Sequence, residues 1–470
     1  MVKTKILWVD DEVELLKPHI IFLEEKDFLI TTSNNGSDAI ELIKEENFDA
    51  VLLDENMPGL NGIETLAIMK EIDSNIPIIM ITKSEEEKIM DDAIGNKISD
   101  YLIKPVNPKQ IFLSLKKNLN NREIISDTTI SGYQQEFRNI SIELLDIDSI
   151  KGWVDMYLKL VSWEIKLEEN NNDTMMEVLI SQKNEANRLF AKFIENNYQQ
   201  WVNNKSSNPI LSNSLIKDRL VKELSDSKPT LFLVIDNLRY DQWKVIEPLI
   251  NNYYNKIHEE AYFSILPTTT QYSRNSLFSG LMPSEIEKNH PNYWKNDSDE
   301  GGKNLYEEQL LKDNLKRLGY SNISCEYNKI TNLKNGQKLS ANLKAKLKND
   351  LTVIVYNFVD MLSHSKTEME IIKELASNDK GYRSLTLSWF KNSPLFEIIK
   401  KGYEYGFKLV VTTDHGTINV KNPSKIIGNK DTSQNLRYKT GRSLSYDNKE
   451  IISFDNPNDI LLPSISINSS

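Results

Sequence analysis

The stretch Ala50-Val51-Leu52-Leu53-Asp54-Glu55-Asn56-Met57-Pro58-Gly59 decides the fold of the first part of this chain. A run of consecutive apolar residues, Ala50–Leu53, is typical of a strand that is buried on both faces of a sheet. The run ends at an acidic residue, Asp54, and Pro58 and Gly59 shape the loop that follows. The stretch therefore predicts a buried strand whose carboxyl end presents a carboxylate.

Further short apolar runs flank this strand between Lys5 and Leu119. We predict buried strands over Ile6–Val9, Ile30–Thr32, Ala50–Leu53, Ile76–Ile81 and Tyr101–Ile103. We predict amphipathic helices over Glu12–Glu24, Ser37–Glu45 and Gly62–Glu71. Five strands that alternate with helices predict a doubly wound, parallel α/β sheet. In such sheets the chemistry lies at the carboxyl ends of the strands.

The residues at these strand ends form a specific set. They are Asp10-Asp11-Glu12 after the first strand, Asp54 after the third, Thr82 after the fourth and Lys104-Pro105 after the fifth. With this set, residues 1–121 resemble the receiver domain of response regulators. The resemblance implies that a sensor histidine kinase phosphorylates Asp54.

The chemistry of a phosphorylated aspartate explains the acidic members of the set. Asp10, Asp11 and Asp54 offer hard oxygen ligands to one Mg²⁺. The ion offsets the charge of the phosphoryl group that arrives on Asp54.

The remaining members would respond to the phosphoryl group. Lys104 supplies a positive charge to a phosphate oxygen, and Thr82 supplies a hydroxyl donor. Tyr101 stands where the receiver family has an aromatic switch residue, and the resemblance implies a cis peptide bond between Lys104 and Pro105. It also implies a homodimer, formed on phosphorylation through a face that includes Ser84–Asp92 and Pro108–Leu119.

Strand patterns disappear in the middle of the chain, where apolar residues recur at helical spacing. We predict a helical-bundle linker of three helices over residues 122–205, with a polar break at Asn170–Asp173. One more helix is predicted over Ile210–Leu224. The apolar stripes would also suit a cofactor site or a kinase-docking face, but a helical core is the simpler interpretation. No DNA-binding helix-turn-helix is evident.

A second α/β pattern begins near Pro229. We predict buried strands over Leu231–Ile235, Leu351–Phe358 and Leu409–Thr413. Acidic residues and histidines follow them, namely Asp236, Asp360 with His364, and Asp414 with His415. Imidazole and carboxylate groups are the usual ligands of zinc. The hydroxyl-rich turn Leu266–Gln271 opens a predicted helix and can present a nucleophile where the helix dipole favours an anion.

This set resembles the alkaline phosphatase superfamily of two-zinc enzymes, and within it the PglZ domain, over residues 206–470. Receiver, helical bundle and PglZ domain in one chain resemble the PorX-type response regulators, which are linked to type IX secretion. The resemblance implies that a threonine of the turn attacks phosphorus. The spacing from Pro267 favours Thr270, with Thr269 next.

The resemblance also implies the roles of the other site residues. It assigns Asp236, Thr270, Asp414 and His415 to one zinc, Asp360 and His364 to a second zinc, and Asn275 to a phosphoryl oxygen. Two adjacent zinc ions would activate the threonine oxygen and stabilise the leaving oxygen.

One feature departs from the family pattern. The family supplies a further histidine to the second zinc, inside a His-Gly-Gly sequence, but no histidine follows His415 here. We therefore expect a PglZ domain that lacks its C-terminal segment, with a firmer zinc site at Asp414 and His415 than at Asp360 and His364. Residues Asn289–Asp350, rich in Asn, Lys, Asp and Gly, are interpreted as an insertion that caps the site.

The composition narrows the class of protein. Its 57 Lys and Arg residues against 68 Asp and Glu leave a net charge of -11, which disfavours direct DNA binding. The single cysteine, Cys325, excludes a disulfide within the chain and suits a reducing compartment. No signal peptide and no membrane-spanning run is evident, so we expect a cytoplasmic protein.

Together these patterns predict a two-component response regulator whose output is a zinc-dependent phosphodiesterase or phosphatase. The PglZ resemblance favours a nucleotide-type phosphodiester as the substrate. The alternative is a non-catalytic, metal-binding scaffold that docks a sigma factor or a secretion component.

Overall fold

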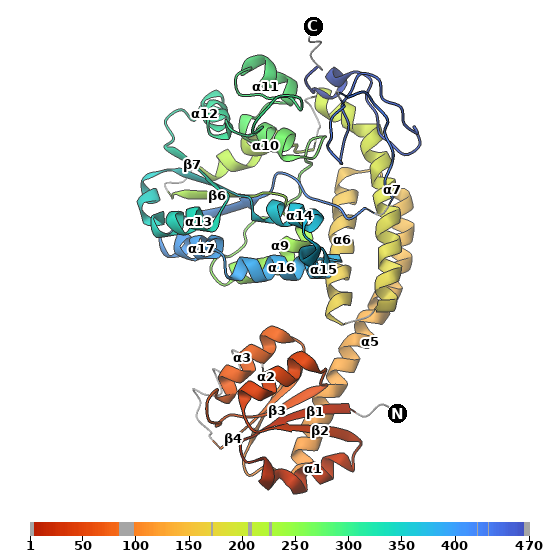
Figure 1. Ribbon diagram of the computed structural model, residues 1–470, viewed down its shortest axis with the longest axis vertical. Helices are drawn as coiled ribbons and strands as arrows, with labels where there is room; N and C mark the ends of the chain where they lie inside the picture. The colour runs from red at the N-terminus through yellow and green to blue at the C-terminus, as the bar shows by residue number, and fades with distance from the viewer. Residues whose placement is uncertain are drawn as a thin grey trace. The chain divides into compact units, whose positions relative to one another are not determined.

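The computed structural model describes residues 4–83, 98–170, 173–204, 209–224, 228–420, 422–430 and 432–464. The chain divides into two compact units. The first consists of Met1–Ile142 and Trp163–Leu179, and the second of Glu143–Ser162 and Ile180–Ser470. Figure 1 shows the elements of both units.

The first unit contains a sheet of five strands in the order β2-β1-β3-β4-β5. The strands are β1 (Thr4–Val9), β2 (Phe28–Ser33), β3 (Ala50–Asp54), β4 (Ile78–Thr82) and β5 (Asp100–Ile103). Every neighbouring pair is parallel. The predicted α/β sheet is therefore confirmed, and each strand overlaps its predicted range.

Helices cover both faces of this sheet (Figure 1). They are η1 (Val13–Leu16), α1 (Lys17–Glu24), α2 (Gly36–Glu45), α3 (Gly62–Ile72) and α5 (Pro108–Asp146). Successive side chains of a strand point to opposite faces. In β1, Leu7 and Val9 lie in a buried cluster with α2 and α3, whereas Ile6 and Trp8 lie in a second cluster with α1 and α5.

The start of α3 brings this helix against the end of β3. Asn61 caps the helix by accepting a hydrogen bond from the Glu64 amide, and the Glu64 side chain accepts one from the Asn61 amide. A Cβ atom at Gly62 would lie 2.4 Å from the carbonyl oxygen of Asp54. Only glycine permits this close approach.

The linker consists of α5, α6 (Ile150–Glu169) and α7 (Asp173–Asn203). Three helices were predicted here and three are present. The predicted receiver helix Pro108–Leu119 is not separate from the linker, however, because it forms the beginning of the 39-residue helix α5. No proline interrupts residues 109–146, so nothing in the sequence ends the helix there.

The apolar stripes of the linker form aromatic contacts within each unit. In the first unit, the rings of Tyr133 and Trp163 have centroids 5.4 Å apart. In the second unit, the rings of Trp153 and Phe190 have centroids 5.3 Å apart. These contacts agree with the interpretation of the stripes as a helical core.

The second unit contains a parallel sheet of four strands in the order β7-β8-β6-β9. The strands are β6 (Thr230–Ile235), β7 (Cys325–Ile330), β8 (Leu351–Tyr356) and β9 (Lys408–Thr412). β6, β8 and β9 match the three predicted strands. β7 was not predicted.

The helices of the second unit cover both faces of this sheet (Figure 1). They are α9 (Tyr240–Asn251), α10 (Thr270–Ser279), α11 (Pro283–Asn289), α12 (Glu307–Arg317), α13 (Leu333–Ala341), α14 (Phe358–Glu368), α15 (Glu370–Leu375), α16 (Asp379–Lys391) and α17 (Pro394–Glu404). Phe232 and Val234 of β6 lie in a buried cluster with α10 and α12. Leu231 and Leu233 lie in another cluster with α9 and α17.

One sequence interpretation of this unit was wrong, and one predicted helix was too long. Residues Asn289–Asp350 are not a mere insertion, because α12, β7 and α13 belong to the layers of the domain and β7 pairs with β8 along its whole length. The predicted helix Ile210–Leu224 is shorter than expected. It consists of a π-helical turn, Ile216–Leu220, followed by α8 (Val221–Glu223).

After β9, the described residues form loops with one short 3₁₀ helix, Pro457–Ile460, and an isolated bridge between Ile427 and Ser445. None of the helices in the described ranges has both the length and the apolar character needed to cross a lipid bilayer.

Candidate functional site

An acidic cluster lies at the carboxyl ends of β1 and β3. Carboxylate oxygens of Asp10, Asp11 and Asp54 all lie within 4.8 Å of one another. β1 and β3 are neighbours in the sheet, which is why residues distant in sequence meet at its edge. Asp10 and Asp54 are buried and Asp11 is exposed. The cluster has the oxygen ligands that Mg²⁺ prefers.

Lys104 reaches into this cluster from the end of β5. Its Nζ atom lies 2.9 Å from Asp10 Oδ2 and 2.9 Å from Asp54 Oδ1. The predicted cis peptide bond between Lys104 and Pro105 is confirmed. Burial raises the pKa of Asp54, although the hydrogen bond from Lys104 opposes this effect. For Lys104, burial lowers the pKa, but the bonds to Asp54 and Asp10 outweigh it and raise the value.

Thr82 has a partner that the sequence did not suggest. It is fully buried, and its hydroxyl donates a hydrogen bond to the buried carboxylate of Glu55. Glu55 directly follows Asp54 in the chain, and its amide donates to the carbonyl oxygen of Ile81, the residue before Thr82. The pKa of Tyr101 is raised, because the effect of burial outweighs that of a hydrogen bond with Thr82, which lowers the pKa. The structure therefore brings together the residues that were predicted to act as a switch. The predicted dimer segment Ser84–Asp92 lies outside the described residues.

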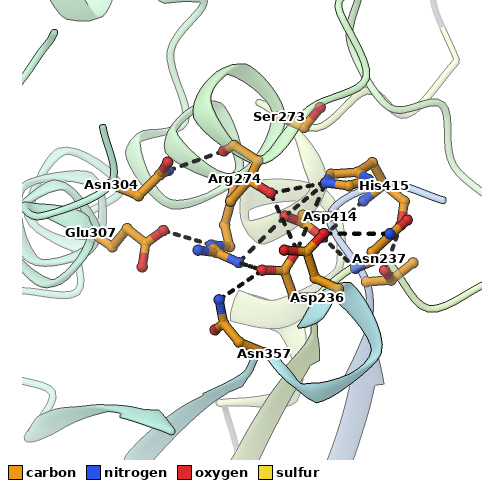
Figure 2. A network of polar contacts seen from close by, with 12 residues as sticks. Asp236, Asn237, Ser273, Arg274, Asn304, Glu307, Asn357, Asp414 and His415 are labelled. Atoms are coloured by element: carbon orange, nitrogen blue, oxygen red, sulfur yellow. Dashed lines mark hydrogen bonds and ion pairs between the residues drawn. The ribbon is translucent and has the colours of Figure 1, made fainter. Parts of the chain in front are cut away.

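A second cluster lies at the carboxyl ends of β6 and β9, which are also neighbours. Asp236 follows β6, and Asp414 and His415 follow β9. Ligand atoms of these three residues lie within 4.8 Å of one another, and all three are buried (Figure 2). Within the described residues, this cluster and the one in the first unit are the two groups of three or more such side chains close enough to share a metal ion.

Thr270 is the first residue of α10 and joins this second cluster. Its Oγ1 atom lies 3.0 Å from His415 Nε2 and 3.4 Å from Asp236 Oδ1. The positive end of the α10 dipole lies at the same point. Thr269, the other candidate nucleophile, occupies the N-cap position, and its hydroxyl has no hydrogen-bond partner among the described residues. The geometry favours Thr270 over Thr269.

Each of the two carboxylates has one oxygen engaged and one oxygen facing the cluster. Asp414 Oδ1 accepts hydrogen bonds from the amides of Asn237 (3.2 Å) and His415 (3.0 Å). Asp414 Oδ2 is buried without a hydrogen-bond partner in the described structure. Asp236 Oδ2 accepts from Arg274 (2.5 Å) and Asn357 (3.0 Å), which leaves Oδ1 toward Thr270 and His415.

The donor set fits a divalent metal ion. Two carboxylate oxygens, one imidazole nitrogen and one hydroxyl oxygen converge, which is the ligand chemistry of a four-coordinate zinc site. Burial and the neighbouring charge of Asp414 raise the pKa of Asp236 to about 8. Such a raised pKa indicates an excess of buried negative charge, which a cation would relieve.

Arg274 is the main residue of this site to which the sequence analysis gave no role. It is almost completely buried and bonds to Asp236 and to Glu307 of α12, and it lies 3.6 Å from Asp414 Oδ2 (Figure 2). The sequence did contain a signal for this role. Arg274 lies four residues after Thr270, so a helix that starts at Thr270 places both side chains on the same face.

Asp360 and His364 lie near this cluster but do not form a comparable one. His364 Nε2 is 3.6 Å from Asp360 Oδ2, and 72% of the His364 side chain is exposed. Asp360 Oδ1 is linked to the second cluster by Asn237, whose Nδ2 atom donates to Asp360 over 3.4 Å and whose amide donates to Asp414. Within the described residues, the two side chains belong to no group of three potential metal ligands.

Asn275 does not point its amide at the cluster. Its Nδ2 group donates to the carbonyl oxygens of Gln271 (2.8 Å) and Lys303 (3.1 Å). These bonds give Asn275 a structural place between α10 and the following loop. They lend no support to the predicted contact with a phosphoryl oxygen.

Residues between α11 and α12 contact the Thr270 turn, as was expected of a segment that caps the site. Asn304 Nδ2 donates to the carbonyl oxygen of Thr270 over 3.0 Å, and Gln271 donates to the carbonyl oxygen of Lys295 over 2.9 Å. From the other side, Arg437 donates to the carbonyl oxygens of Thr268 and Gly416.

Comparison with protein families divides the chain in three. Residues 6–116 match the response regulator receiver domain, and residues 123–202 match the PorX response regulator linker domain. Residues 216–461 match the BREX system PglZ alkaline phosphatase-like domain, which is more than half of the chain.

Curated transcriptional regulatory proteins match about a quarter of the chain. The transcriptional regulatory protein ResD of Bacillus subtilis is 37% identical over 114 residues, which are 24% of this chain and 47% of ResD. A CpxR homolog of Haemophilus influenzae is 36% identical over 135 residues, which are 26% of this chain and 58% of that protein. The chain thus spans about half the length of these relatives.

Similar solved structures also match the receiver part. A response regulator receiver domain from Methanospirillum hungatei is 24% identical with a TM-score of 0.25, and the match covers 26% of this chain and 97% of that one. The response regulator TrrA of Thermotoga maritima is 27% identical with a TM-score of 0.23, and the match covers 24% of this chain and 98% of that one.

Proposed function

The chain belongs to the PglZ family of alkaline phosphatase-like domains, joined to a receiver and a PorX linker as in PorX-type response regulators, and we propose that its output is zinc-dependent cleavage of a phosphate ester. One observation carries the proposal. The Thr270 hydroxyl, the His415 imidazole and the free oxygens of Asp236 and Asp414 converge at the N-terminus of α10.

In the proposed reaction, Asp236, Asp414 and His415 hold the metal ion, and Thr270 is the nucleophile. Zinc would act as a Lewis acid and lower the pKa of a bound hydroxyl group. Thr270 gives up its proton to water, and its oxygen forms a bond to phosphorus while the bond to the leaving alkoxide oxygen breaks and that oxygen takes up a proton from water. Water then cleaves the phosphothreonine and regenerates the hydroxyl. The PglZ membership favours a phosphodiester of nucleotide type as substrate.

Hydrolysis of bis-p-nitrophenyl phosphate with added zinc tests this proposal. We expect turnover by the unaltered chain and a loss of roughly a thousandfold or more in Thr270→Ala, because the nucleophile is removed. Ser276→Ala is the matched control. Ser276 lies on the same helix, and its buried hydroxyl has no hydrogen-bond partner in the described structure. Turnover that survives in Thr270→Ala would refute the assignment of the nucleophile.

A second candidate function is a metal-binding scaffold without turnover, which docks a sigma factor or a type IX secretion component. The exposed side chain of His364 favours it, because within the described residues Asp360 and His364 belong to no group of three potential metal ligands. Zinc bound at a stoichiometry of one, with no hydrolysis in any variant, would support the scaffold over the enzyme.

For the first unit, we propose that a sensor histidine kinase phosphorylates Asp54, with Mg²⁺ held by Asp10, Asp11 and Asp54. Incubation with acetyl phosphate and Mg²⁺ should label the unaltered chain and leave Asp54→Asn unlabelled, as followed on phosphate-affinity gels. The matched control is Asp27→Asn. Asp27 is exposed and has a positive φ of 65°, which asparagine also tolerates. Equal labelling of Asp54→Asn would exclude Asp54 as the acceptor.

The remaining parts of the proposal concern partners and place. We propose a cytoplasmic regulator with domains over residues 1–121, 122–205 and 206–470, Thr82 and Tyr101 as its switch, and no direct contact with DNA. Phosphorylation would assemble a homodimer through the receiver face that contains the start of α5. Light scattering with and without acetyl phosphate measures that dimer, and an unchanged mass would argue against it.

A further inference from the structure

We propose that Arg274 and Glu307 form a positioning pair that restricts Asp236 to a single metal-facing oxygen and thereby selects a small, four-coordinate divalent ion. The inference rests on the proposed metal site but not on turnover. It assigns a role to two residues outside the proposed metal ligands and nucleophile.

Arg274 is held rigidly against Asp236. Its side chain is 1% exposed, and Nη1 donates to Asp236 Oδ2 over 2.5 Å. Because α10 places Arg274 one helical turn after Thr270, both side chains reach the cluster from the same face of the helix. A buried guanidinium has few alternative partners, so this bond fixes the carboxylate.

Glu307 anchors the other side of the guanidinium. It is 1% exposed and accepts a hydrogen bond from Arg274 Nε over 2.6 Å. The Tyr327 hydroxyl and Lys329 Nζ, both from β7, also donate to Glu307. The anchor therefore comes from α12 and β7, elements that lie far from Thr270 in sequence.

The pair leaves four protein atoms for a metal ion. Arg274 and Asn357 engage Asp236 Oδ2, and two backbone amides engage Asp414 Oδ1. The atoms left are Asp236 Oδ1, Asp414 Oδ2, His415 Nε2 and Thr270 Oγ1. Four mixed nitrogen and oxygen ligands suit tetrahedral Zn²⁺. Larger ions prefer more oxygens, often from a bidentate carboxylate, and Asp236 cannot supply both of its oxygens.

The charges agree with this division of roles. Arg274 shares a buried ion pair with Glu307, and Lys329 also pairs with Glu307. Arg274 and Lys329 therefore bring two positive charges to three carboxylates, those of Glu307 and of the fully buried Asp236 and Asp414. Negative charge is left in excess, which a divalent ion would offset, so Arg274 orients Asp236 without replacing the metal.

Competition of the full chain with a chromophoric chelator, for Zn²⁺ and for Mn²⁺, tests the proposal. In Arg274→Met, the ratio of the Mn²⁺ to the Zn²⁺ dissociation constant should fall by about tenfold, because Asp236 Oδ2 becomes free to bind. Asn357→Ala removes the other donor to the same oxygen and should shift the ratio in the same direction, which provides a second variant if Arg274→Met does not fold. Arg188→Met, at an exposed arginine of α7, is the matched control and should not change the ratio.

An equal loss of affinity for both ions in Arg274→Met and Asn357→Ala would overturn the proposal, because it would mean that the pair only supports the fold. Absence of Zn²⁺ binding by the unaltered chain would overturn it as well. The expected shift in the ratio without any ester hydrolysis would uphold this inference and refute the enzymatic function alone.

Discussion

Asp236 and Asp241 are two buried carboxylates close together in the chain that differ in chemistry. Asp241 lies between Arg239 (Nε to Oδ1, 2.9 Å) and Arg383 (Nη1 to Oδ2, 2.5 Å). Burial alone would raise the pKa of Asp241, but the two arginines outweigh it and lower the value. Asp236 has one arginine but faces Asp414, and its pKa is raised to about 8. At this scale, Asp241 is satisfied by the arginines of the protein itself, and Asp236 is suited to a metal ion.

The residue-scale prediction concerns Asp241. Asp241→Asn should lower the free energy of unfolding of the second unit by about 3–5 kcal/mol at pH 7, because the buried carboxylate loses its ion pairs with Arg239 and Arg383. The folded pKa of Asp241 lies below the unfolded value, so its stabilisation is present above about pH 4 and is lost as pH falls through the folded pKa. Urea unfolding at pH 7 and pH 3 should show the difference between variant and unaltered chain shrink at the lower pH.

The control for this prediction is Asp447→Asn, an exposed aspartate whose side chain accepts a local hydrogen bond from the Lys449 amide. It should change the stability by less than about 0.5 kcal/mol. A difference for Asp241→Asn that is the same at both pH values would contradict the ionic explanation.

At the scale of elements, helix starts place the site residues. α3 begins against the carboxyl end of β3, and α10 begins at Thr270 beside the ends of β6 and β9. In both units a helix start therefore meets a strand end at the site. In the first unit, Gly62 makes this approach possible.

The element-scale prediction compares two glycines. Gly62→Ala should destabilise the first unit by about 1–3 kcal/mol, because the new Cβ atom would lie 2.4 Å from Asp54 O and 2.6 Å from Glu55 Cα. Gly132→Ala, within α5, meets only Trp163 at an ordinary 3.4 Å and should stabilise the helix by up to about 1 kcal/mol. Thermal unfolding and labelling by acetyl phosphate measure both effects, and a Gly62→Ala variant as stable as the unaltered chain would disprove the close approach.

At the scale of the whole molecule, the same arrangement occurs twice. Each unit has a parallel sheet with a carboxylate cluster at the carboxyl ends of adjacent strands. The clusters differ in ligands, since the first offers only oxygens and a lysine, and the second includes an imidazole and a hydroxyl. We therefore expect the two units to respond to different metal ions.

The whole-molecule prediction uses hydrogen exchange of the full chain with and without zinc. The amides of Asn237 and His415 donate to Asp414, so zinc should increase protection in peptides that contain them. At a zinc concentration of a hundred times the dissociation constant, the gain should approach about 2.7 kcal/mol. Chelation should reverse it, and peptides from β1 and β3 should not change.

Asp414→Asn serves as the control in this measurement, because it retains the side-chain shape and removes a charged ligand. It should abolish the zinc effect. Protection that rises equally in β1 and β3 would contradict separate metal sites.

The sequence by itself determined the two α/β sheets and the identity of the strand-end residues. Strands such as Ala50–Asp54 and Leu351–Tyr356 are continuous apolar runs because parallel sheets are buried on both faces, and this signal is local. The sequence analysis ended the last receiver helix at Leu119, but α5 continues to Asp146. No local pattern marks this continuity, which follows only from the absence of a residue that would end the helix.

Only the tertiary structure decided the rest. β7 has the sequence CEYNKI and is mostly half-buried, since an edge strand needs few apolar residues, and its alternating polar side chains hid it. The roles of Arg274, Glu307 and Glu55 depend on contacts between distant segments or across neighbouring strands, which no local pattern encodes. Strand ends meet at one edge whatever their spacing in sequence, so the chemistry of each site could be predicted while the positioning of its atoms could not.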